Sequence, residues 1–279
     1  MGSYIDRLLA KSLKDLKACL GADGKRIPRG LIHALECDPR RGAQKMAAFL
    51  RKRNLKTKAE TRRLDHLLRF ERELWIQGIG FIAGVDEAGM APLAGPVVAA
   101  AVILPREFKL PGLDDSKKIA SPRKRETLAG QIKRHAVCYA SATAEVDEID
   151  KLNIYHAGIL AMRRAIEGLK IKPEYILLDA RTIPDCETPQ RGIVRGDSAS
   201  ASIAAASIIA KTTRDALMIE LGRQYPDYGF ESHKGYPTAM HLRALNEYGV
   251  LPIHRRSFAP IRAALGIGPA QAKLFPDMR

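Results

Sequence analysis

The chain contains few cysteines, and none of them forms a C-x-x-C pair. Its 279 residues include four, Cys19, Cys37, Cys138 and Cys186. This spacing fits neither the common zinc sites nor the disulfide framework of a small secreted domain. We therefore expect free thiols in a reducing compartment.

Apolar segments suited to a membrane are also lacking. Charged residues interrupt the first 15 positions, which excludes the continuous apolar core of a signal peptide. The longest uncharged run, residues 88–105, contains Pro92, Pro96 and two glycines, which make it a poor membrane-spanning helix. We expect a soluble, cytoplasmic monomer with no membrane partner.

Basic residues are abundant and unevenly distributed. The chain carries 46 Lys and Arg against 31 Asp and Glu, a net charge of +15. Residues 1–75 hold 19 of the basic and 9 of the acidic residues, so +10 of this charge lies in the first quarter. Such a segment favours a polyanionic partner, and the alternative is a solvated helical surface with no partner. The 46% hydrophobic content excludes disorder over most of the chain.

The spacing of apolar residues predicts a small, basic helical unit over residues 1–78. Asp38 before Pro39 is typical of a helix start, Gly78 ends the last helix, and residues 21–28 interrupt the pattern. The predicted helices cover residues 5–20, 39–50 and 57–76.

From residue 79 onward, strands and helices alternate. The predicted strands cover residues 81–85, 97–104, 137–143, 175–178 and 193–194. The predicted helices cover residues 121–136, 154–169 and 202–221, and one more runs from 238 to Gly249. This alternation predicts an α/β fold whose sheet is covered on both faces.

Four acidic residues stand at strand ends or before a helix: Asp86, Glu87, Asp179 and Asp197. Ligands of open α/β sheets bind at the carboxyl ends of strands. Asp86 and Glu87 point to opposite faces of a regular strand, so we expect them to converge only if the chain bends, for which Gly89 offers a place. A lone strand-end Asp is more often a turn or helix cap, so function depends on the four meeting in space.

Acids gathered at one edge would repel one another unless a cation neutralised them. Oxygen ligands of this kind suit Mg²⁺ or Mn²⁺. A basic protein with such a site favours two-metal phosphodiester chemistry. Two other charged groups receive structural interpretations: Arg214-Asp215 as a pair within a helix, and the acids of residues 145–150 as a solvated helix start.

Several motifs resemble those of the ribonuclease HII family, and they follow one another in the family's order over residues 80–262. They are Gly84-Val-Asp-Glu-Ala-Gly89 with residues 92–104, Leu113-Asp-Asp-Ser-Lys-Lys118, Leu177-Leu-Asp179, Gly196-Asp197 with residues 202–211, His233-Lys-Gly-Tyr236 and Pro252-Ile-His-Arg-Arg-Ser-Phe258. Residues 38–44 and 71–75 resemble the basic extension carried by the enzymes of some Gram-positive bacteria.

This resemblance implies a ribonuclease H-like mixed sheet flanked by helices in residues 79–262, a helical, nucleic-acid-binding extension in residues 1–78, and a tail in residues 263–279. It implies that the four acids hold two divalent cations, Mg²⁺ or Mn²⁺, and hydrolyse the phosphodiester 5′ of a ribonucleotide, leaving a 5′-phosphate. The implied substrate is an RNA/DNA hybrid or a duplex containing ribonucleotides. Lys117 and Lys211 match backbone-contacting positions, and Tyr236 matches the tyrosine that stacks by the ribose and senses its 2′-hydroxyl.

One motif departs from the family. Gly-Arg-Gly is usual where this chain has Gly89-Met90-Ala91, and the backbone groups of that segment read the 2′-hydroxyl in the family. The backbone N–H groups survive the change. Alanine costs about 1 kcal/mol or more if its position needs positive φ. We expect hybrid cleavage to survive, and the preference for a single ribonucleotide is the property at risk. The alternatives are a non-catalytic hybrid-binding protein and a nuclease of the same fold with another specificity.

Overall fold

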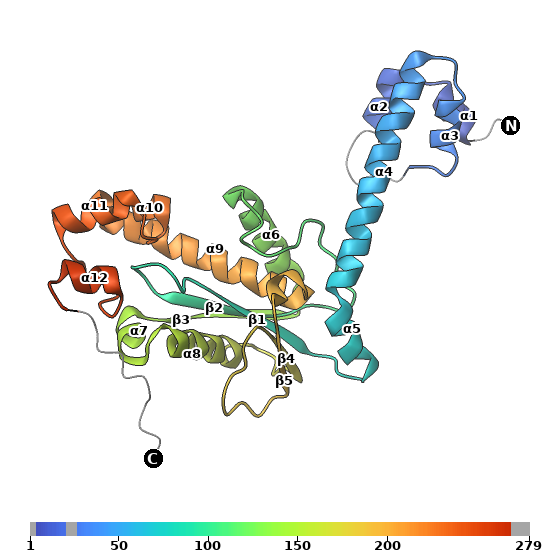
Figure 1. Ribbon diagram of the computed structural model, residues 1–279. Helices are drawn as coiled ribbons and strands as arrows, with labels where there is room; N and C mark the ends of the chain where they lie inside the picture. The colour runs from blue at the N-terminus through green and yellow to red at the C-terminus, as the bar shows by residue number, and fades with distance from the viewer. Residues whose placement is uncertain (1–3, 21–26, 269–279) are drawn as a thin grey trace. The chain divides into compact units, whose positions relative to one another are not determined.

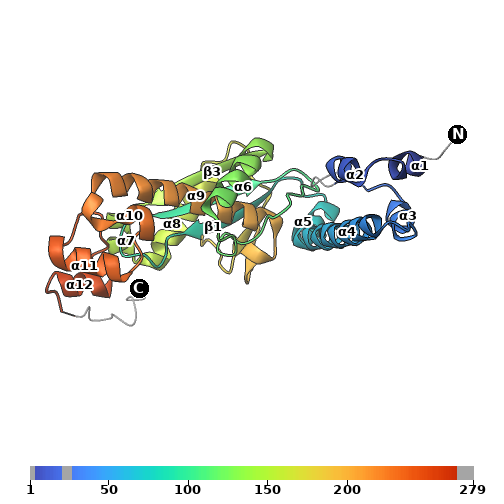
Figure 2. The same cartoon turned by 90° about the horizontal axis from the view of Figure 1, so that it is seen from above.

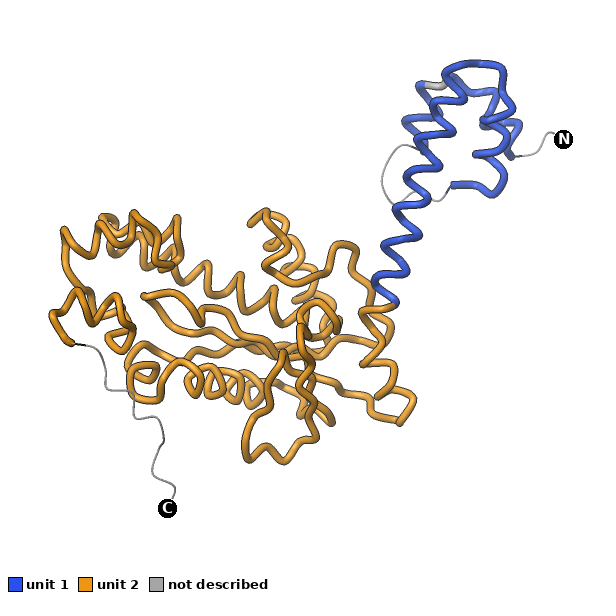
Figure 3. Tube along the Cα trace, in the orientation of Figure 1, with its two compact units in different colours: residues 1–65 blue, residues 66–279 orange. Residues whose placement is uncertain are grey.

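The computed structural model describes residues 4–20 and 27–268 and divides into two compact units, residues 1–65 and 66–279 (Figure 3). The boundary expected from the sequence lies at residue 78. Helix α5 (Arg69–Ile76) therefore belongs to the second unit and not to the basic extension. Residues 21–26 of the predicted break and residues 269–279 of the predicted tail lie outside the described residues.

The second unit is built on a mixed five-stranded sheet in the order β3-β2-β1-β4-β5. Its strands are β1 (Ile82–Ala88), β2 (Val97–Ile103), β3 (Cys138–Ala144), β4 (Tyr175–Asp179) and β5 (Gln190–Ile193). β1 pairs antiparallel with β2 and parallel with β4. Every residue of β2 is buried, as expected for an apolar strand covered on both faces. The fold class inferred from the sequence is confirmed.

Two strand predictions need correction. β1 continues three residues beyond the predicted end at Val85, because the antiparallel ladder with β2 continues to Ala88. β5 starts at Gln190 and overlaps the predicted strand only at Ile193. As the edge strand, β5 pairs with β4 alone and has two exposed residues, so it lacks the apolar run that marks an inner strand.

Helices cover both faces of this sheet (Figure 1). Helix α9 (Ala201–Gln224) packs on β1 and β2 from one side, and α8 (Ile154–Glu167) packs on β2 and β3 from the other. Helix α6 (Pro122–His135) lies beside α9, as Figure 2 also shows. The first ten residues of α9 are all buried and mostly small, which is typical of a helix enclosed by its neighbours.

The start of α9 approaches β1 closely at Gly84. A Cβ atom at Gly84 would overlap the backbone carbonyl group of Ser202, so only glycine permits this contact. Asp86 follows two residues later on the same strand. The glycine therefore fixes the distance between α9 and the strand that carries the first predicted acids.

The C-terminal part of the second unit consists of short helices around Phe230, Tyr228 and Leu245. They are η2 (Pro226–Tyr228), α10 (Phe230–His233), α11 (Ala239–Tyr248) and α12 (Ala259–Ala264). The domain end expected at residue 262 therefore falls inside α12.

The acidic cluster at residues 145–150 forms a helix start, as predicted, and several of its members also make specific contacts. Glu145 and Glu148 form a capping box at the start of α7 (Val146–Leu152), and Glu148 pairs with Arg164 at 2.6 Å. Asp150 accepts hydrogen bonds from the backbone N–H groups of Arg256 and Ser257 at 3.0 and 2.8 Å. The cluster thus ties the segment after α11 to α7.

The first unit has its own core, formed by leucines that include Leu16, Leu31, Leu35 and Leu50. Its helices are α1 (Tyr4–Leu9), α2 (Leu13–Leu20), α3 (Leu31–Glu36) and α4 (Arg41–Leu67), of which α4 continues beyond the unit. The predicted helix over residues 5–20 is broken at Ser12, whose Oγ accepts a hydrogen bond from Asp15 N–H at 3.1 Å. The helices predicted over residues 39–50 and 57–76 are joined, because residues 51–56 contain no glycine or proline, and the second is broken at Leu68, just before α5 begins.

Candidate active site

Asp86 and Glu87 lie within the regular part of β1, opposite Ala100 and Ala99 of β2. The ladder is regular through both residues, so Gly89 produces no bend between them, contrary to the condition expected for their convergence. Their charges nevertheless interact, since Glu87 raises the pKa of Asp86. Asp86 is 3% exposed and lies close enough to Ser207 of α9 for that hydroxyl to lower its pKa. The Ser207 Oγ atom itself is hydrogen-bonded to Ser116 Oγ at 2.8 Å. Glu87 faces Arg181, whose Nη2 lies 3.4 Å from its Oε1.

Asp179 joins this pair through the parallel pairing of β1 with β4. Val85 is paired with Leu178, so Asp179 stands beside Asp86 at the next register position. The Oδ1 atom of Asp179 accepts a hydrogen bond from Gly196 N–H at 2.7 Å. That contact brings the 3₁₀ turn η1 (Gly196–Ser198), with the buried Asp197, to the same edge of the sheet, the one formed by the C-terminal ends of β1 and β4.

The acids influence one another electrostatically. Burial raises the pKa of Asp86 well above its ordinary value, and the charges of Glu87 and Asp179 raise it further. Burial also raises the pKa of Glu87 and that of Asp197, and Asp179 contributes to both shifts. The structure thus gathers the four sequence-predicted acids into one electrostatic cluster.

Two cationic side chains border these carboxylates. The Nζ atom of Lys117 lies 3.7 Å from Asp197 Oδ2. Burial lowers the pKa of Lys117, but four nearby carboxylates outweigh this effect and raise it; they are Asp86, Asp197, Asp115 and Asp179. Arg181 is the second cation: it faces Glu87, and its guanidinium lies 5.2 Å from the centre of the Tyr155 ring.

The donor set at this edge fits hard divalent cations. It consists of carboxylate oxygens, and Glu87 Oε2 is buried without a hydrogen-bond partner in the described part of the chain. Burial raises the pKa values of Asp86 and Asp197, and neighbouring carboxylates raise them further, so a cation bound there would favour the ionised carboxylates. No three acidic, histidine or cysteine side chains of residues 4–20 and 27–268 enclose a metal position as they stand.

The Gly89-Met90-Ala91 segment begins a loop, residues 89–96, that is held by a buried arginine. Arg255 is fully buried and donates to four carbonyl groups of this loop: those of Gly89 at 2.6 Å, Pro92 at 2.8 Å, Gly95 at 3.0 Å and Met90 at 3.1 Å. Burial lowers its pKa to about 9. One guanidinium therefore holds four carbonyl groups of the loop, and backbone hydrogen bonds from Leu93 N–H to Gly235 and from Gly95 N–H to Ile253 add to this support.

A second buried arginine joins this loop to the segment before Tyr236. Arg214 donates to the carbonyl groups of Ala94, Pro96 and Lys234, each at 3.1 Å. Burial lowers the pKa of Arg214 to about 10. Asp215, its neighbour in sequence, instead pairs with Lys211 and Arg125. Both residues make contacts within the fold, as predicted for a structural pair. The side-chain hydrogen bonds of each, however, go to other residues.

Three buried histidines support the same region, and their hydrogen bonds define their tautomers. Leu251 N–H donates to His254 Nδ1 at 2.9 Å, so the proton of neutral His254 is on Nε2. That proton is donated to His241 Nε2 at 3.0 Å, which leaves His241 Nδ1–H to donate to the Tyr236 carbonyl at 3.0 Å. Burial lowers the pKa of His254 to about 4, in keeping with neutral rings.

Met90 and Ala91 show how the altered motif is accommodated. A Cβ atom at Gly158 of α8 would lie 3.2 Å from Met90 Sδ and 3.1 Å from Arg181 Nη1, so Met90 packs on α8 near Arg181. Gly89 has φ of +96°, whereas Ala91 is not among the residues with positive φ. Alanine at position 91 therefore carries no left-handed backbone strain.

Lys211 and Tyr236 do not lie in the carboxylate cluster but together border a separate hollow of about 430 Å³. Lys234 and Arg125 also line it, and Tyr236 is 41% exposed. The Nζ atom of Lys211 lies 2.6 Å from Asp215 Oδ1. The candidate residues thus form two groups. Lys117 lies with the four acids, whereas Lys211 and Tyr236 lie at the hollow.

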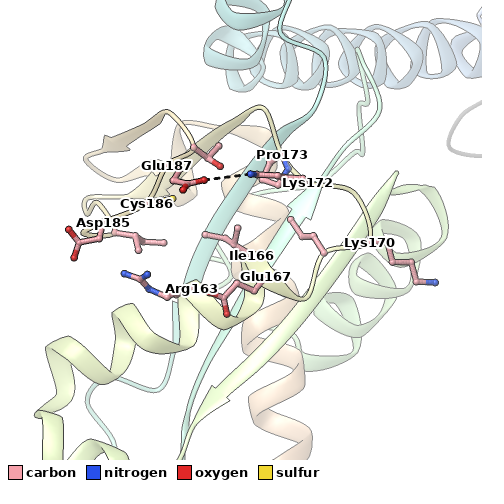
Figure 4. Close-up of a pocket in the computed structure, with 12 residues that line it drawn as sticks. Arg163, Ile166, Glu167, Lys170, Lys172, Pro173, Asp185, Cys186 and Glu187 are labelled. Carbon is pink, nitrogen blue, oxygen red and sulfur yellow. Dashed lines mark ion pairs between the residues drawn. The ribbon is translucent and has the colours of Figure 1, made fainter.

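Another cavity, of about 540 Å³, lies between α8 and the segment that joins β4 to β5 (Figure 4). Arg163 and Lys170 border it, and Lys172 pairs there with Glu187 at 3.9 Å. Its lining includes none of the sequence-predicted site residues.

Several residues at the site were not identified from the sequence, although most lie inside the recognised motifs. Asp115 is part of residues 113–118, Ser207 of residues 202–211 and Arg255 of residues 252–258. Arg181, two residues after Asp179, lies outside every motif. Its role depends on the loop after β4, for which the sequence offers no periodic signal.

Comparison with known proteins gives matches over both parts of the chain. A family model described as Ribonuclease HII matches residues 83–261, and one described as Ribonuclease HII N-terminal domain matches residues 12–75. Ribonuclease HII of Myxococcus xanthus is 59% identical over 98% of this chain and 95% of that protein. Ribonuclease HII of Geobacillus thermodenitrificans is 50% identical over 92% of this chain and 98% of that protein.

Solved structures also resemble the fold. Ribonuclease H2 of Pyrococcus horikoshii matches with a TM-score of 0.57 and 26% identity, over 66% of this chain and 96% of that one. RNase HII of Archaeoglobus fulgidus, solved in complex with PCNA, matches with a TM-score of 0.56 and 25% identity over the same shares.

We predict that Arg255→Lys loosens the 89–96 loop. Lysine keeps the charge but cannot reach four carbonyl groups at once, so some are left unsatisfied at about 1–3 kcal/mol each. Amide exchange in residues 89–96 should accelerate and the urea midpoint should fall. Arg256→Lys, at the exposed neighbouring position, is the control. Equal effects of the two substitutions would contradict this prediction.

We predict that Asp86→Asn stabilises the protein in EDTA. A carboxyl whose pKa is raised by folding binds its proton more tightly in the folded state, so its cost to stability grows as pH rises through the raised pKa. The melting temperature should therefore rise at pH 8, by about 2–4 °C for each kcal/mol removed, and the gain should shrink toward pH 4. Exposed Asp147→Asn should have no such effect; a lower melting temperature for Asp86→Asn at pH 8 would contradict the argument.

Proposed function

Since this chain belongs to the ribonuclease HII family, whose members cleave RNA in RNA/DNA hybrids, we propose that it is a divalent-metal-dependent endoribonuclease that also nicks DNA 5′ of embedded ribonucleotides. The products would carry 5′-phosphate ends. The observation that carries this proposal is the gathering of four carboxylates at one sheet edge, Asp86, Glu87, Asp179 and Asp197. Burial and mutual repulsion there raise the pKa values of Asp86, Glu87 and Asp197.

Asp86, Glu87, Asp179 and Asp197 would hold the divalent ions. Mg²⁺ or Mn²⁺, when bound, supplies Lewis acidity that activates water and stabilises the leaving oxygen of a phosphodiester. The protein contributes the placement of its oxygen ligands: Gly196 N–H donates to the Asp179 carboxylate at 2.7 Å, and the hydroxyl of Ser207 lies close to Asp86. Lys117, which borders the same edge, is placed to contact a phosphate of the bound strand.

The hollow bordered by Lys211 and Tyr236 supports binding of the nucleic-acid backbone. Lys211, Lys234 and Arg125 line it, and ammonium and guanidinium groups bind phosphates without regard to base sequence. The partly exposed Tyr236 ring lies in the same hollow and is suited to stacking against a sugar or base. We assign to Tyr236 the recognition of the ribose.

Recognition of the 2′-hydroxyl is assigned to the backbone of Gly89, Met90 and Ala91. Ala91 avoids positive φ, and Arg255 accounts for the carbonyl groups of Gly89 and Met90, so the backbone N–H groups keep a fixed conformation despite the substitutions. This supports retained nicking at single ribonucleotides. Altered junction specificity is the second candidate, favoured by the Met90 side chain, which packs on α8 and supplies no charge.

The basic first unit is proposed to add sequence-independent affinity for the duplex. Lys52, Lys56 and Lys58 are exposed on α4 and lie within the segment that carries most of the net charge. Each phosphate neutralised by such a residue releases condensed counterions, which makes affinity depend on salt.

Cleavage of a hybrid duplex tests the proposal. The wild-type protein should cleave it with Mg²⁺ or Mn²⁺ and not with EDTA. Asp179→Asn should lower the rate by several orders of magnitude, since it removes a ligand charge, while exposed Asp147→Asn should retain it. An unchanged rate in Asp179→Asn, or cleavage in EDTA, would refute the metal-dependent mechanism.

The altered motif is tested with two duplexes, one with a single ribonucleotide and one with a run of four. We expect the wild type to nick both, because the backbone of residues 89–91 is intact. If the single ribonucleotide is cleaved much more slowly and Met90→Arg with Ala91→Gly restores it, the altered-specificity candidate is correct instead.

For the first unit, we predict that replacing Lys52, Lys56 and Lys58 together by glutamine weakens duplex binding. The slope of log affinity against log salt should fall by about 0.9 for each phosphate that the variant no longer neutralises. Lys172→Gln, in the second unit and 79% exposed, serves as a charge control. If the triple variant has the wild-type slope, these lysines do not bind the duplex, and α4 is a solvated helix with no nucleic-acid partner.

A further inference from the structure

A carboxylate of α5 is buried against the start of α9. Glu71 is 2% exposed, and its Oε1 atom accepts three hydrogen bonds. The donors are Ser200 Oγ at 2.6 Å, Ser202 Oγ at 2.7 Å and Ser202 N–H at 2.9 Å. A negative charge at the N-terminus of a long helix is also favoured by the helix dipole.

This contact is connected to the turn that carries Asp197. Ser200 is the N-cap of α9, and its backbone N–H donates to the Gly196 carbonyl at 2.8 Å. Gly196 N–H in turn donates to Asp179 Oδ1 at 2.7 Å. Glu71 is therefore linked through one serine to the turn that joins Asp179 and Asp197.

The same contact also fixes α9 against β1. Ser202 is the residue whose backbone lies against Gly84, where no Cβ atom fits. Further along α9, Ser207 lies close to Asp86 and its hydroxyl lowers the pKa of that carboxyl. A shift of the start of α9 would therefore displace Ser207 as well as the turn that holds Asp197.

Stability alone does not account for this carboxylate. Its second oxygen, Glu71 Oε2, is buried and has no hydrogen-bond partner in the described part of the chain. A buried charged group with an unsatisfied oxygen is costly to keep. Exposed Glu73, on the same helix, pairs with Arg191 at 3.4 Å and carries no such cost.

We propose that Glu71 is a positioning residue of the active site, which holds the start of α9 and the turn of Asp197 in register with β1 and β4. Helix α5 is then part of the catalytic scaffold, whereas the first unit supplies affinity. This inference rests on the proposed function, because it concerns the placement of the acids assigned there to metal binding.

The test compares Glu71→Ala, Glu71→Gln and the control Glu73→Gln in the full chain. Glutamine is able to keep the three hydrogen bonds through its carbonyl oxygen, so we expect a smaller loss than with alanine. Groups that support metal ligands typically contribute 10–100-fold to metal affinity or activity. We expect Glu71→Ala to lower kcat in that range with KM within about twofold, and Glu73→Gln to match the wild type.

Two further readouts separate positioning from stability. Mn²⁺ affinity, measured by calorimetry without nucleic acid, should fall in Glu71→Ala by a similar factor. Trp75 is the only tryptophan and packs in the cluster that contains Ile203 of α9, so its fluorescence reports whether α5 remains docked. If Glu71→Ala does not fold, the same measurements on Glu71→Gln decide, with a loss of at least several-fold expected.

Wild-type kcat and Mn²⁺ affinity in a folded Glu71 variant would overturn the positioning role, as would a loss confined to KM. Failure of the proposed function is distinguishable, because the wild-type protein itself would then not cleave a hybrid duplex.

Discussion

The structure depends on bringing four carboxylates together against their mutual repulsion. Asp86 is buried beside Glu87 and Asp179, and its raised pKa shows the cost of that placement. Parallel pairing of β1 with β4 places Asp86 beside Asp179, and Gly196 N–H attaches the turn of Asp197. Each of these contacts holds a carboxylate close to others that repel it. The resulting loss of folding stability is a common cost of a preorganised site.

Two buried arginines near the 89–96 loop are stabilised by hydrogen bonds to carbonyl groups. Arg255 and Arg214 are surrounded by backbone carbonyl groups, and burial lowers the pKa of each. Between them they fix the 89–96 loop and join it to the segment that ends in Tyr236. The carboxylates and the loop proposed to read the 2′-hydroxyl are therefore held by different hydrogen bonds. They meet at Met90, which packs near Arg181, the partner of Glu87.

Much of the fold was predictable from the sequence because its signals are local. The apolar run of β2 and the Ser121 cap of α6 were correctly placed. The helix break at Ser12 was not predicted and the end of β1 was placed too early, since one depends on a side-chain cap and the other on pairing with β2. Edge strand β5 is polar and short, so its position depends on its partner β4.

The candidate acids were identified from their positions and from the family motifs, but their arrangement was not. No periodicity indicates that Asp86 and Glu87 stay in a regular strand while Asp179 joins them from β4. Arg181 and Glu71 were missed because their contacts connect residues distant in sequence: Glu71 meets Ser200 and Ser202 across about 130 positions. Such contacts are properties of the packed structure.

The central claim is that these carboxylates form one divalent-cation site before any nucleic acid binds. Calorimetric titration of Mn²⁺ into the wild-type protein, Asp86→Asn and Asp179→Asn tests it directly. We predict binding to the wild type and a loss of affinity above about 100-fold in each variant, since even groups that only support ligands contribute 10–100-fold. Wild-type affinity in both variants would contradict the claim.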